Sequence, residues 1–431
     1  MKGKFQIIII AVFLVSAILG VLVFSGAIPL GGGGDSTGAQ GTVILWGTVK
    51  AQIVNSLLDD FGRANPTFVV KYVEKSKDTF DNDLLEALAG GVGPDMFFIS
   101  DDLAFKYSDK IFTIPYQSFP LNVFKDSFVG AGEVFLTSKG ILAFPLAVDP
   151  LVMYYNRSML DANGVTHPPV YWDELANLVP ILTKKDENGA AVKSAVAMGH
   201  FSNVLHAKDI LSSLFMQVGN SIVEEDRGSF VSVLDENDGS YDLGSVLKFY
   251  TDFADPSKNV YSWNKSFPSS VDAFSRESLA FYFGFAGELE SLIKKNPNQN
   301  FQAAPFPQVR NSNFRMTSAH VTGVAISSFS KNFNTAFTAA NLLTSSNFAS
   351  EFAASLGVVP ARRSLINKAP TDSFLPAFYA SALYARSWLD PSPKDTNNIF
   401  SIMVEKVLSN SLSAPQAMDD ANSKLGLLLI K

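Results

Sequence analysis

The chain has 431 residues, 47% of them hydrophobic and 17% charged, with a formal net charge of -7. This length allows two or more domains with sizeable cores, and the negative charge excludes the basic surface of a typical nucleic-acid-binding protein. The sequence contains no cysteine, which excludes disulfides, thiolate nucleophiles and zinc–thiolate sites.

The chain begins with a segment long enough to span a bilayer. Residues 5–24 are nearly uncharged, two lysines precede them, and the next basic residue is Lys50. The positive-inside rule then predicts a cytoplasmic N-terminus and a body on the extracellular or periplasmic side. A cleaved signal peptide is the alternative, because residues 25–27 form an acceptable cleavage site. We therefore expect an anchor or signal peptide at residues 1–25 and a flexible glycine-rich linker at residues 26–41.

After the linker, three short apolar segments alternate with two amphipathic ones. The apolar segments are typical of buried strands, and each amphipathic segment carries one apolar helical face. In chain order we expect strand, helix, strand, helix and strand at Thr42–Trp46, Val49–Phe61, Phe68–Val73, Phe80–Ala89 and Met96–Ile99. This order predicts a parallel sheet with right-handed crossovers.

Two carboxylates, Asp101 and Asp102, follow the third predicted strand. Ligands of open α/β sheets bind beyond the carboxyl ends of the strands, so these side chains are well placed to accept hydrogen bonds from ligand hydroxyls. The alternative is a solvated loop that caps the next helix.

The segment from Gly140 to Leu178 organises the rest of the chain. Two apolar runs predict buried strands at Ile141–Val148 and Leu151–Tyr155, with Pro145 as a break in the first. Asp149-Pro150 is expected to stop regular pairing between the two strands. A short helix is expected next, ending at an Asn-Gly pair.

The order and spacing of short motifs in this segment resemble the hinge region of extracellular solute-binding proteins of the maltose-binding type. The matching motifs are Phe144-Pro145-Leu146-Ala147-Val148-Asp149, Tyr154-Tyr155-Asn156-Arg157, Gly164, Pro168-Pro169 and Trp172-Asp173-Glu174. Asn65-Pro66 and Pro94-Asp95-Met96 match the family earlier in the chain, and Gly357-Val358-Val359-Pro360-Ala361 matches it later. The resemblance covers nearly all of residues 42–429.

The resemblance implies a two-lobed α/β fold, the periplasmic-binding-protein fold of type II, with an interlobe hinge and a ligand cleft. The first lobe would hold residues 42–147 and 305–345. The second would hold residues 148–304 and 346–431. The N-terminal transmembrane helix would precede both lobes.

The same resemblance implies which side chains bind the ligand. They follow strands, lie at the hinge or fall on family motifs of the second lobe: Trp46, Lys50, Asp101, Asp102, Asp149, His200, Phe201, Phe285, Glu288 and Phe400. Alternatives remain at two of them, since Lys50 could be a solvated residue at a helix start and Asp149 could cap the crossing backbone. A metal site at His200 and His206 would need a loop that brings the two rings together, and we expect none.

The function implied is the receptor of an ABC uptake transporter, which binds a sugar or oligosaccharide and docks on a membrane permease. We expect a monomer with no cofactor, no catalytic residue and no enzymatic activity. The four tryptophans argue against a long maltodextrin ligand. A tethered sensor domain is one alternative. A glycoside hydrolase is another, but nothing in the sequence sets a second carboxylate opposite Asp101, Asp102 or Asp149 across a scissile bond.

Overall fold

The computed structural model describes residues 39–189, 191–236, 242–313, 315–366 and 371–430. The predicted membrane segment and most of the predicted linker lie outside these residues. The described chain from Gln40 onward forms one unit by its internal contacts. Among the described helices, none combines the length and the apolar character needed to cross a bilayer.

The first part of the fold is the parallel sheet expected from the sequence. Strand β1 (Gly41–Gly47) pairs in parallel with β2 (Phe68–Glu74) on one side and with β3 (Met96–Ser100) on the other. Helices α2 (Ala51–Ala64) and α3 (Phe80–Ala89) make the two crossovers. Each helix buries one apolar stripe, as its 3.6-residue periodicity predicts.

The central strand β6 (Ala143–Asn156) is fourteen residues long and continuous. The expectation that Asp149-Pro150 stops regular pairing was therefore wrong. Up to Pro150 the strand pairs with β13 (Thr317–Ile326), and from Leu151 onward it pairs with β11 (Leu279–Phe285). Pro150 lies where one ladder ends and the next begins, a position at which its missing N–H is tolerated.

The break expected at Pro145 is a β-bulge. The register between β6 and β13 shifts between Thr322 and Gly323, which face Ala147 and Pro145 respectively, so Leu146 has no opposite residue. A bulge of this kind bends the strand and increases its twist without ending it.

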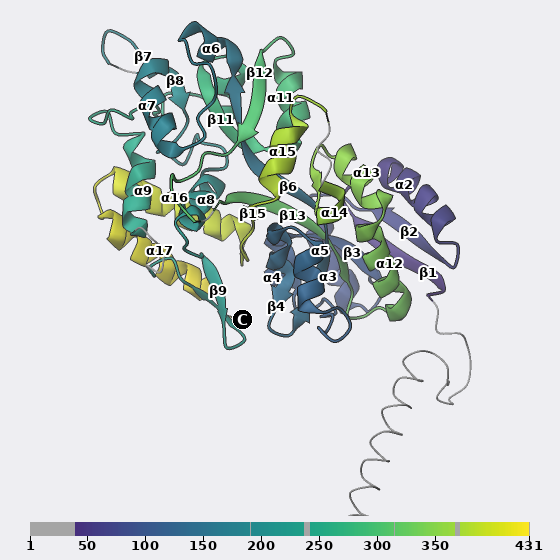
Figure 1. The fold of residues 1–431 in the computed structure, drawn as a ribbon. Helices are drawn as coiled ribbons and strands as arrows, with labels where there is room; N and C mark the ends of the chain where they lie inside the picture. The colour runs from purple at the N-terminus through teal and green to yellow at the C-terminus, as the bar shows by residue number, and fades with distance from the viewer. Residues whose placement is uncertain (1–38, 190, 237–241, 314, 367–370, 431) are drawn as a thin grey trace, which may run out of the picture. The chain divides into compact units, whose positions relative to one another are not determined.

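Strands β6 and β13 join the two parts of an eleven-stranded mixed sheet, with the order β2-β1-β3-β13-β6-β11-β8-β7. Strand β13 pairs with β3 as well as β6, and β12 (Phe301–Pro305) pairs with the second half of β6. Figure 1 shows β6 and β13 between two groups of elements, one around β1–β3 and one around β8, β11 and β12. The remaining strands are β4 (Leu136–Thr137), β5 (Gly140–Ile141), β7 (Lys184–Lys185), β8 (Ala191–Val196), β9 (Val223–Asp226), β10 (Ser229–Ser232), β14 (Val359–Pro360) and β15 (Ala385–Arg386).

Helices cover both parts of the sheet. Their bounds are α4 (Asp101–Tyr107), α5 (Leu121–Ser127), α6 (Arg157–Ala162), α7 (Trp172–Leu182), α8 (Ala207–Gln217), α9 (Leu243–Asp252), α10 (Ser270–Ser275), α11 (Leu289–Lys295), α12 (Phe333–Ser345), α13 (Asn347–Ser355), α14 (Arg363–Ile366), α15 (Leu375–Ala382), α16 (Pro393–Leu408) and α17 (Ala414–Leu428), with 3-10 turns at Gly130–Phe135 and Ala286–Glu288. The chain ends with a pair of helices, α16 and α17.

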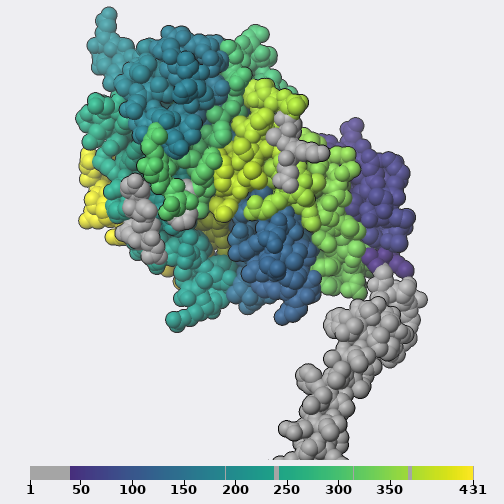
Figure 2. Space-filling view, in the orientation of Figure 1, coloured from purple at the N-terminus to yellow at the C-terminus, as the bar shows by residue number. Residues whose placement is uncertain are grey.

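The β9–β10 hairpin reaches from the second group of elements to the first. Ser138 donates from its backbone N–H and its hydroxyl to the Glu225 carboxylate, at 2.7 and 2.6 Å. The ring of Phe230 packs edge-on against Phe105, with 5.9 Å between the ring centroids. In Figure 2 the teal surface of this hairpin lies against the blue surface of the segment from α4 to β5.

One buried glutamine ties α8 to the chain on either side of it. Gln217 is fully buried and accepts a hydrogen bond from the indole N–H of Trp172 at 2.8 Å. Its amide group donates to the backbone carbonyls of Pro307 and Met316, each at 2.8 Å. Because Trp172 and Pro307 are buried and Met316 is partly buried, the amide of Gln217 satisfies groups that water reaches poorly.

Replacing Gln217 by methionine should lower the free energy of unfolding by about 3 kcal/mol, because one N–H and two carbonyls lose a partner inside the protein. Urea denaturation measures this loss. The matched control is Gln52→Met on the exposed face of α2, for which a change within about 0.5 kcal/mol is expected. Equal stability of the two variants would contradict this account of Gln217.

Candidate functional site

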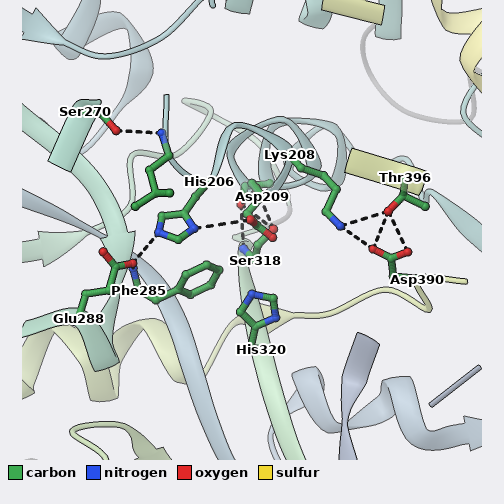
Figure 3. A network of polar contacts seen from close by, with 12 residues as sticks. His206, Lys208, Asp209, Ser270, Phe285, Glu288, Ser318, His320, Asp390 and Thr396 are labelled. Carbon is green, nitrogen blue, oxygen red and sulfur yellow. Dashed lines mark hydrogen bonds and ion pairs between the residues drawn. The ribbon is translucent and has the colours of Figure 1, made fainter. Parts of the chain in front are cut away.

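A small charged recess of about 60 Å³ lies where elements from both parts of the fold meet. Its walls come from α4, α8, β13 and the segment that follows β15. The residues that line it are Asp101, Asp102, Lys208, Asp209, Ser318, Ala319, His320, Arg386, Ser387, Trp388, Asp390 and Pro393. Figure 3 shows the side chains of α8 and β13 that converge on this region.

His320 stands at the centre of the recess. The residue lies on β13 directly opposite Asp149 of β6, and its side chain keeps 48% of its surface accessible. Its Nδ1 atom lies 3.5 Å from Oδ1 of Asp101. Enclosure of the ring opposes its charge, but the carboxylates of Asp101, Asp209 and Asp149 outweigh this effect and raise the pKa of His320 to about 10. The ring is therefore an imidazolium at neutral pH.

Asp101 is held by two hydrogen-bond donors in addition to His320. One carboxylate oxygen accepts a hydrogen bond from the backbone N–H of Val321 at 2.9 Å, and the other accepts one from the Ser387 hydroxyl at 2.6 Å. Burial alone would raise the pKa of this carboxyl, but the charge of His320 and the hydrogen bonds hold it below its usual value. Asp101 is thus a structural anion that links α4, β13 and the segment after β15.

Lys208 and Asp390 form a buried ion pair on the opposite wall. The Lys208 ammonium lies 2.5 Å from the Asp390 carboxylate, and their side chains are only 13% and 7% exposed. Thr396 at the start of α16 donates to the same carboxylate at 2.9 Å. The pair connects α8 to α16.

His206 and Glu288 form a second pair next to the recess. Nε2 of His206 lies 2.6 Å from Oε1 of Glu288, and Glu288 also accepts hydrogen bonds from the Tyr282 hydroxyl at 2.5 Å and the Phe285 N–H at 2.9 Å. Burial opposes the ionised carboxylate, but these partners lower its pKa. His206 adopts a left-handed backbone conformation with φ of 61°, and such strain in a residue other than glycine is most common at functional sites.

The ring of Phe285 lies between two imidazole rings. The centroid of His206 is 4.8 Å from it and that of His320 is 4.5 Å from it. Phe285 is only 4% exposed, so its ring packs against protein groups and leaves little surface for a ligand.

Asp149 lies beside these groups on β6 with one strong partner. Its carboxylate accepts a hydrogen bond from the backbone N–H of Gly287 at 2.9 Å. Burial dominates here and raises the pKa of Asp149 to about 6. Gly287 permits the contact, because a Cβ at that position would lie 2.9 Å from the other oxygen of the carboxylate.

Asp102 also contributes a carboxylate to this region. Its side chain accepts a hydrogen bond from the hydroxyl of Ser100, and burial together with the charge of Asp101 raises its pKa. A larger recess of about 410 Å³ adjoins this wall, shares Arg386, Ser387 and Trp388 with the charged recess, and is bordered by the β9–β10 hairpin.

Residues 31–347 match the family of bacterial extracellular solute-binding proteins. The chain belongs to this family.

The similarity of this solute-binding protein to individual relatives is more limited. A maltotriose-binding protein of Pyrococcus abyssi is 25% identical over 144 residues, which is 32% of this chain and 30% of that protein. The chain thus matches under a third of the length of this curated relative.

Solved structures share the fold over nearly the whole chain. A cyclo/maltodextrin-binding protein in complex with maltotetraose superposes with a TM-score of 0.72 at 15% identity, over 92% of this chain and 98% of that one. A cyclic alpha-maltosyl-1,6-maltose binding protein of Arthrobacter globiformis gives a TM-score of 0.73 at 15% identity, over 90% and 98% of the two chains. At such identities the similarity shows the two-lobed α/β fold of this family.

The site residues predicted for this solute-binding protein fall into two groups. Asp101 and Asp102 line the charged recess, and Asp149, Phe285 and Glu288 belong to the polar network beside it. No bound molecule tests their role, so ligand contact stays a prediction for all five.

The other five predicted residues have partners of their own. The Lys75 ammonium lies over the ring of Trp46, 3.8 Å from its centroid. The exposed Lys50 forms an ion pair with Glu74 at 3.6 Å. Phe400 is fully buried behind Trp388.

His200 and Phe201 follow β8, as the sequence predicted. The backbone carbonyl of His200 accepts a hydrogen bond from the Tyr250 hydroxyl at 2.7 Å, and burial lowers the pKa of the imidazole. Neither His200 nor His206 belongs to any group of three potential ligands that could hold a metal ion within the described part of the chain.

The sequence did not point to several recess residues that the fold brings in. They come from the first turn of α8, from the middle of β13, from β15 and from the loop that follows β15: Lys208, Asp209, His320, Arg386, Trp388 and Asp390. A signal was present for two of them, since Lys208-Asp209 places adjacent charges at the start of an otherwise apolar helix.

Replacing Lys208 by methionine should lower the free energy of unfolding by about 3 kcal/mol, because the Asp390 carboxylate would stay buried without its counter-ion. Chemical denaturation measures the loss, and the Lys208→Met/Asp390→Asn double variant should recover part of it. The control is Lys294→Met, which breaks the exposed pair with Glu290 and should cost no more than about 0.5 kcal/mol. A loss for Lys208→Met as small as that of the control would refute the buried pair.

Asp149 should make stability fall as the pH rises from about 4 to 6. Its pKa is about 6 in the folded protein against about 3.9 in the unfolded chain, so the folded state binds the proton more tightly and loses this advantage once the carboxyl ionises. Asp149→Asn keeps a hydrogen-bond acceptor for the Gly287 N–H and removes the free-energy cost of ionising a buried carboxyl. Its stability relative to wild type should be about 2 kcal/mol more favourable at pH 7.5 than at pH 4.5.

Urea denaturation at the two pH values checks this difference. The exposed Asp78→Asn serves as the control and should follow wild type at both. A constant offset between Asp149→Asn and wild type would show that Asp149 titrates normally.

Proposed function

We propose that this protein is the extracellular substrate-binding receptor of an ABC uptake transporter, and that it binds a sugar or oligosaccharide in the recess between its two lobes. The observation that carries the proposal is the lining of that recess. Asp101 and Asp102 come from the first lobe, and Lys208 and Asp209 come from the second. A ligand held by both sets of side chains favours the closed arrangement of the lobes.

The chemistry of the lining suits hydroxyl groups. Carboxylates accept hydrogen bonds from hydroxyls, while the ammonium and imidazolium donate to hydroxyl and ring oxygens. Trp388, which is partly exposed at the junction of the two recesses, offers a flat apolar surface of the kind that packs on sugar rings. The names of the relatives, which refer to maltotriose, maltodextrin and a cyclic maltosyl-maltose, support the same class of ligand.

The lobes in this proposal are residues 42–147 with 305–345, and residues 148–304 with 346–431. Strands β6 and β13 cross between them and would act as the hinge. The ten side chains predicted from the sequence remain candidate ligand contacts, and those near the recess are the first to test.

The transporter setting completes the proposal. Residues 5–24 would anchor the protein in the membrane as a single-pass helix, within an N-terminal segment 1–25 and followed by the glycine-rich linker 26–41. The body would work as a monomer outside the cell and would dock, with ligand bound, on a membrane permease. The protein would deliver its ligand unchanged.

A sugar that binds should stabilise the folded protein. At about 100 times its dissociation constant a ligand adds roughly 2.7 kcal/mol, which raises the melting temperature by a few degrees for a chain of this size. Thermal unfolding against mono- and oligosaccharides, polyols, amino acids and peptides measures this shift. A response to sugars alone is the expected outcome.

Two variants test whether the recess is the binding site. Lys208→Met should reduce the shift, whereas Lys294→Met, far from the recess lining, should leave it unchanged. Recovery of the intact sugar after incubation separates a receptor from a hydrolase. A shift produced by peptides or amino acids and not by sugars would overturn the proposal.

A further inference from the structure

The charged groups of the recess and its network do not balance. Six carboxylates belong to this region, and three of them have a side-chain nitrogen of a basic residue within 3.5 Å. Asp101 faces His320 at 3.5 Å, Glu288 faces His206 at 2.6 Å, and Asp390 faces Lys208 at 2.5 Å. The other three carboxylates are Asp102, Asp149 and Asp209.

These three carboxylates have weaker partners. Asp149 accepts one backbone N–H and Asp102 accepts one hydroxyl, and within the described residues neither has a cationic nitrogen within 4 Å. Asp209 lies 4.0 Å from Nδ1 of His206, whose other nitrogen is already held by Glu288. Its side chain is 16% exposed, so water screens it only in part.

Arg386 does not supply the missing charge. Its guanidinium donates to the backbone carbonyl of Ala385 at 3.0 Å and packs directly over Gly130. A Cβ at Gly130 would lie 1.7 Å from Nη1 of Arg386, which shows how closely the guanidinium covers that glycine. No carboxylate of the described chain pairs with Arg386.

All three carboxylates lie close enough to His320 to interact with its charge. His320 is opposite Asp149 in the β6–β13 ladder, and cross-strand neighbours of this kind have their side chains on the same face of a sheet. Ser318, two residues before His320 on that face, donates from its hydroxyl to the backbone carbonyl of Asp209 at 2.9 Å. Asp102 and Asp209 both line the same recess as His320.

One of these carboxylates is also repelled by a neighbour. Burial and then the charge of Asp101 raise the pKa of Asp102, whereas burial raises that of Asp149 to about 6. A positive charge placed beside Asp101 and Asp102 would offset the repulsion between these two carboxylates. A bound metal ion is not the natural source, because within the described residues no three carboxylates or imidazoles are arranged to hold one.

We propose that the ligand of this recess carries a protonated amine, as an amino sugar does, and that Asp149, Asp209 and Asp102 receive it. This inference rests on the proposed function and names the class of sugar. The amine would donate charge-assisted hydrogen bonds to carboxylates that now lack a counter-ion. The hydroxyls of the same sugar would meet the paired groups of the recess.

Three disaccharides with the same β-1,4 linkage isolate the amine: cellobiose, its di-glucosamine counterpart chitobiose, and N,N′-diacetylchitobiose. They differ only at C2, which carries a hydroxyl, an ammonium or a neutral amide. Calorimetric titration of the full-length protein near pH 6.5 should give at least tenfold tighter binding of chitobiose than of either neutral sugar. The preference should weaken at high salt, because it is electrostatic.

The variants locate the amine. Asp149→Asn and Asp209→Asn keep similar shapes and should each reduce the preference for chitobiose about tenfold or more, with little effect on the neutral sugars. Asp78→Asn, on the exposed surface outside the recess, should retain the full preference. Glucosamine against glucose and N-acetylglucosamine repeats the comparison for a smaller ligand.

Three outcomes would overturn the inference that the ligand carries an amine. Equal or tighter binding of a neutral sugar overturns this inference and leaves the proposed function intact. An amine preference that survives in Asp149→Asn, Asp209→Asn and Asp102→Asn also overturns it, because the amine would then bind elsewhere. Failure of every sugar, neutral or amino, overturns this inference and the proposed function together.

Discussion

The ladder between β6 and β13 is the constraint on which the rest of the structure depends. Up to Pro150, β6 pairs with β13 in the first part of the sheet. From Leu151 onward, the same strand pairs with β11 and β12 in the second part. Strand β13 lies between β3 and β6 and pairs with both of them. Because side chains alternate along a strand, this register also decides that His320 and Asp149 face the same region.

Burying charged side chains at such a junction costs desolvation free energy, and several of them lie next to a basic partner. Asp101, Glu288 and Asp390 each contact a basic side chain from a different element, so these contacts also fix how helices and strands meet. Isolated pairs of this kind add little net stability, but removing one partner is costly, which makes them effective at holding one arrangement. The left-handed backbone of His206 is kept within this network, between Glu288 and the first turn of α8.

Local pattern was enough to predict much of the fold, and less of the site. The β-α-β-α-β start followed from periodicity, and the family was identified from its resemblance in motif order, because both signals lie within short segments. The continuity of β6 did not follow, since Asp149-Pro150 is a stop signal unless neighbouring strands on both sides hold the chain extended. Asp101 and Asp102 could be predicted as candidates because they follow a predicted strand, and Asp149 and Glu288 because they fall on family motifs. His320 and Asp390 were not, because only tertiary packing brings residues from β13 and from the loop before α16 next to them.

The position of β13 in the chain has a consequence for synthesis. Strand β3 ends at Ser100, but the partner that covers its open edge ends at Ile326. A ribosome adding 5–20 residues per second needs roughly 10–45 s to cover that distance, so the nascent β1–β3 sheet waits with an unpaired edge for most of translation. Such an edge invites pairing with other extended chains until it is covered. The sheet is therefore completed late. A chain truncated before β13 would keep the edge of β3 unpaired and prone to aggregation, and would not form a smaller stable lobe.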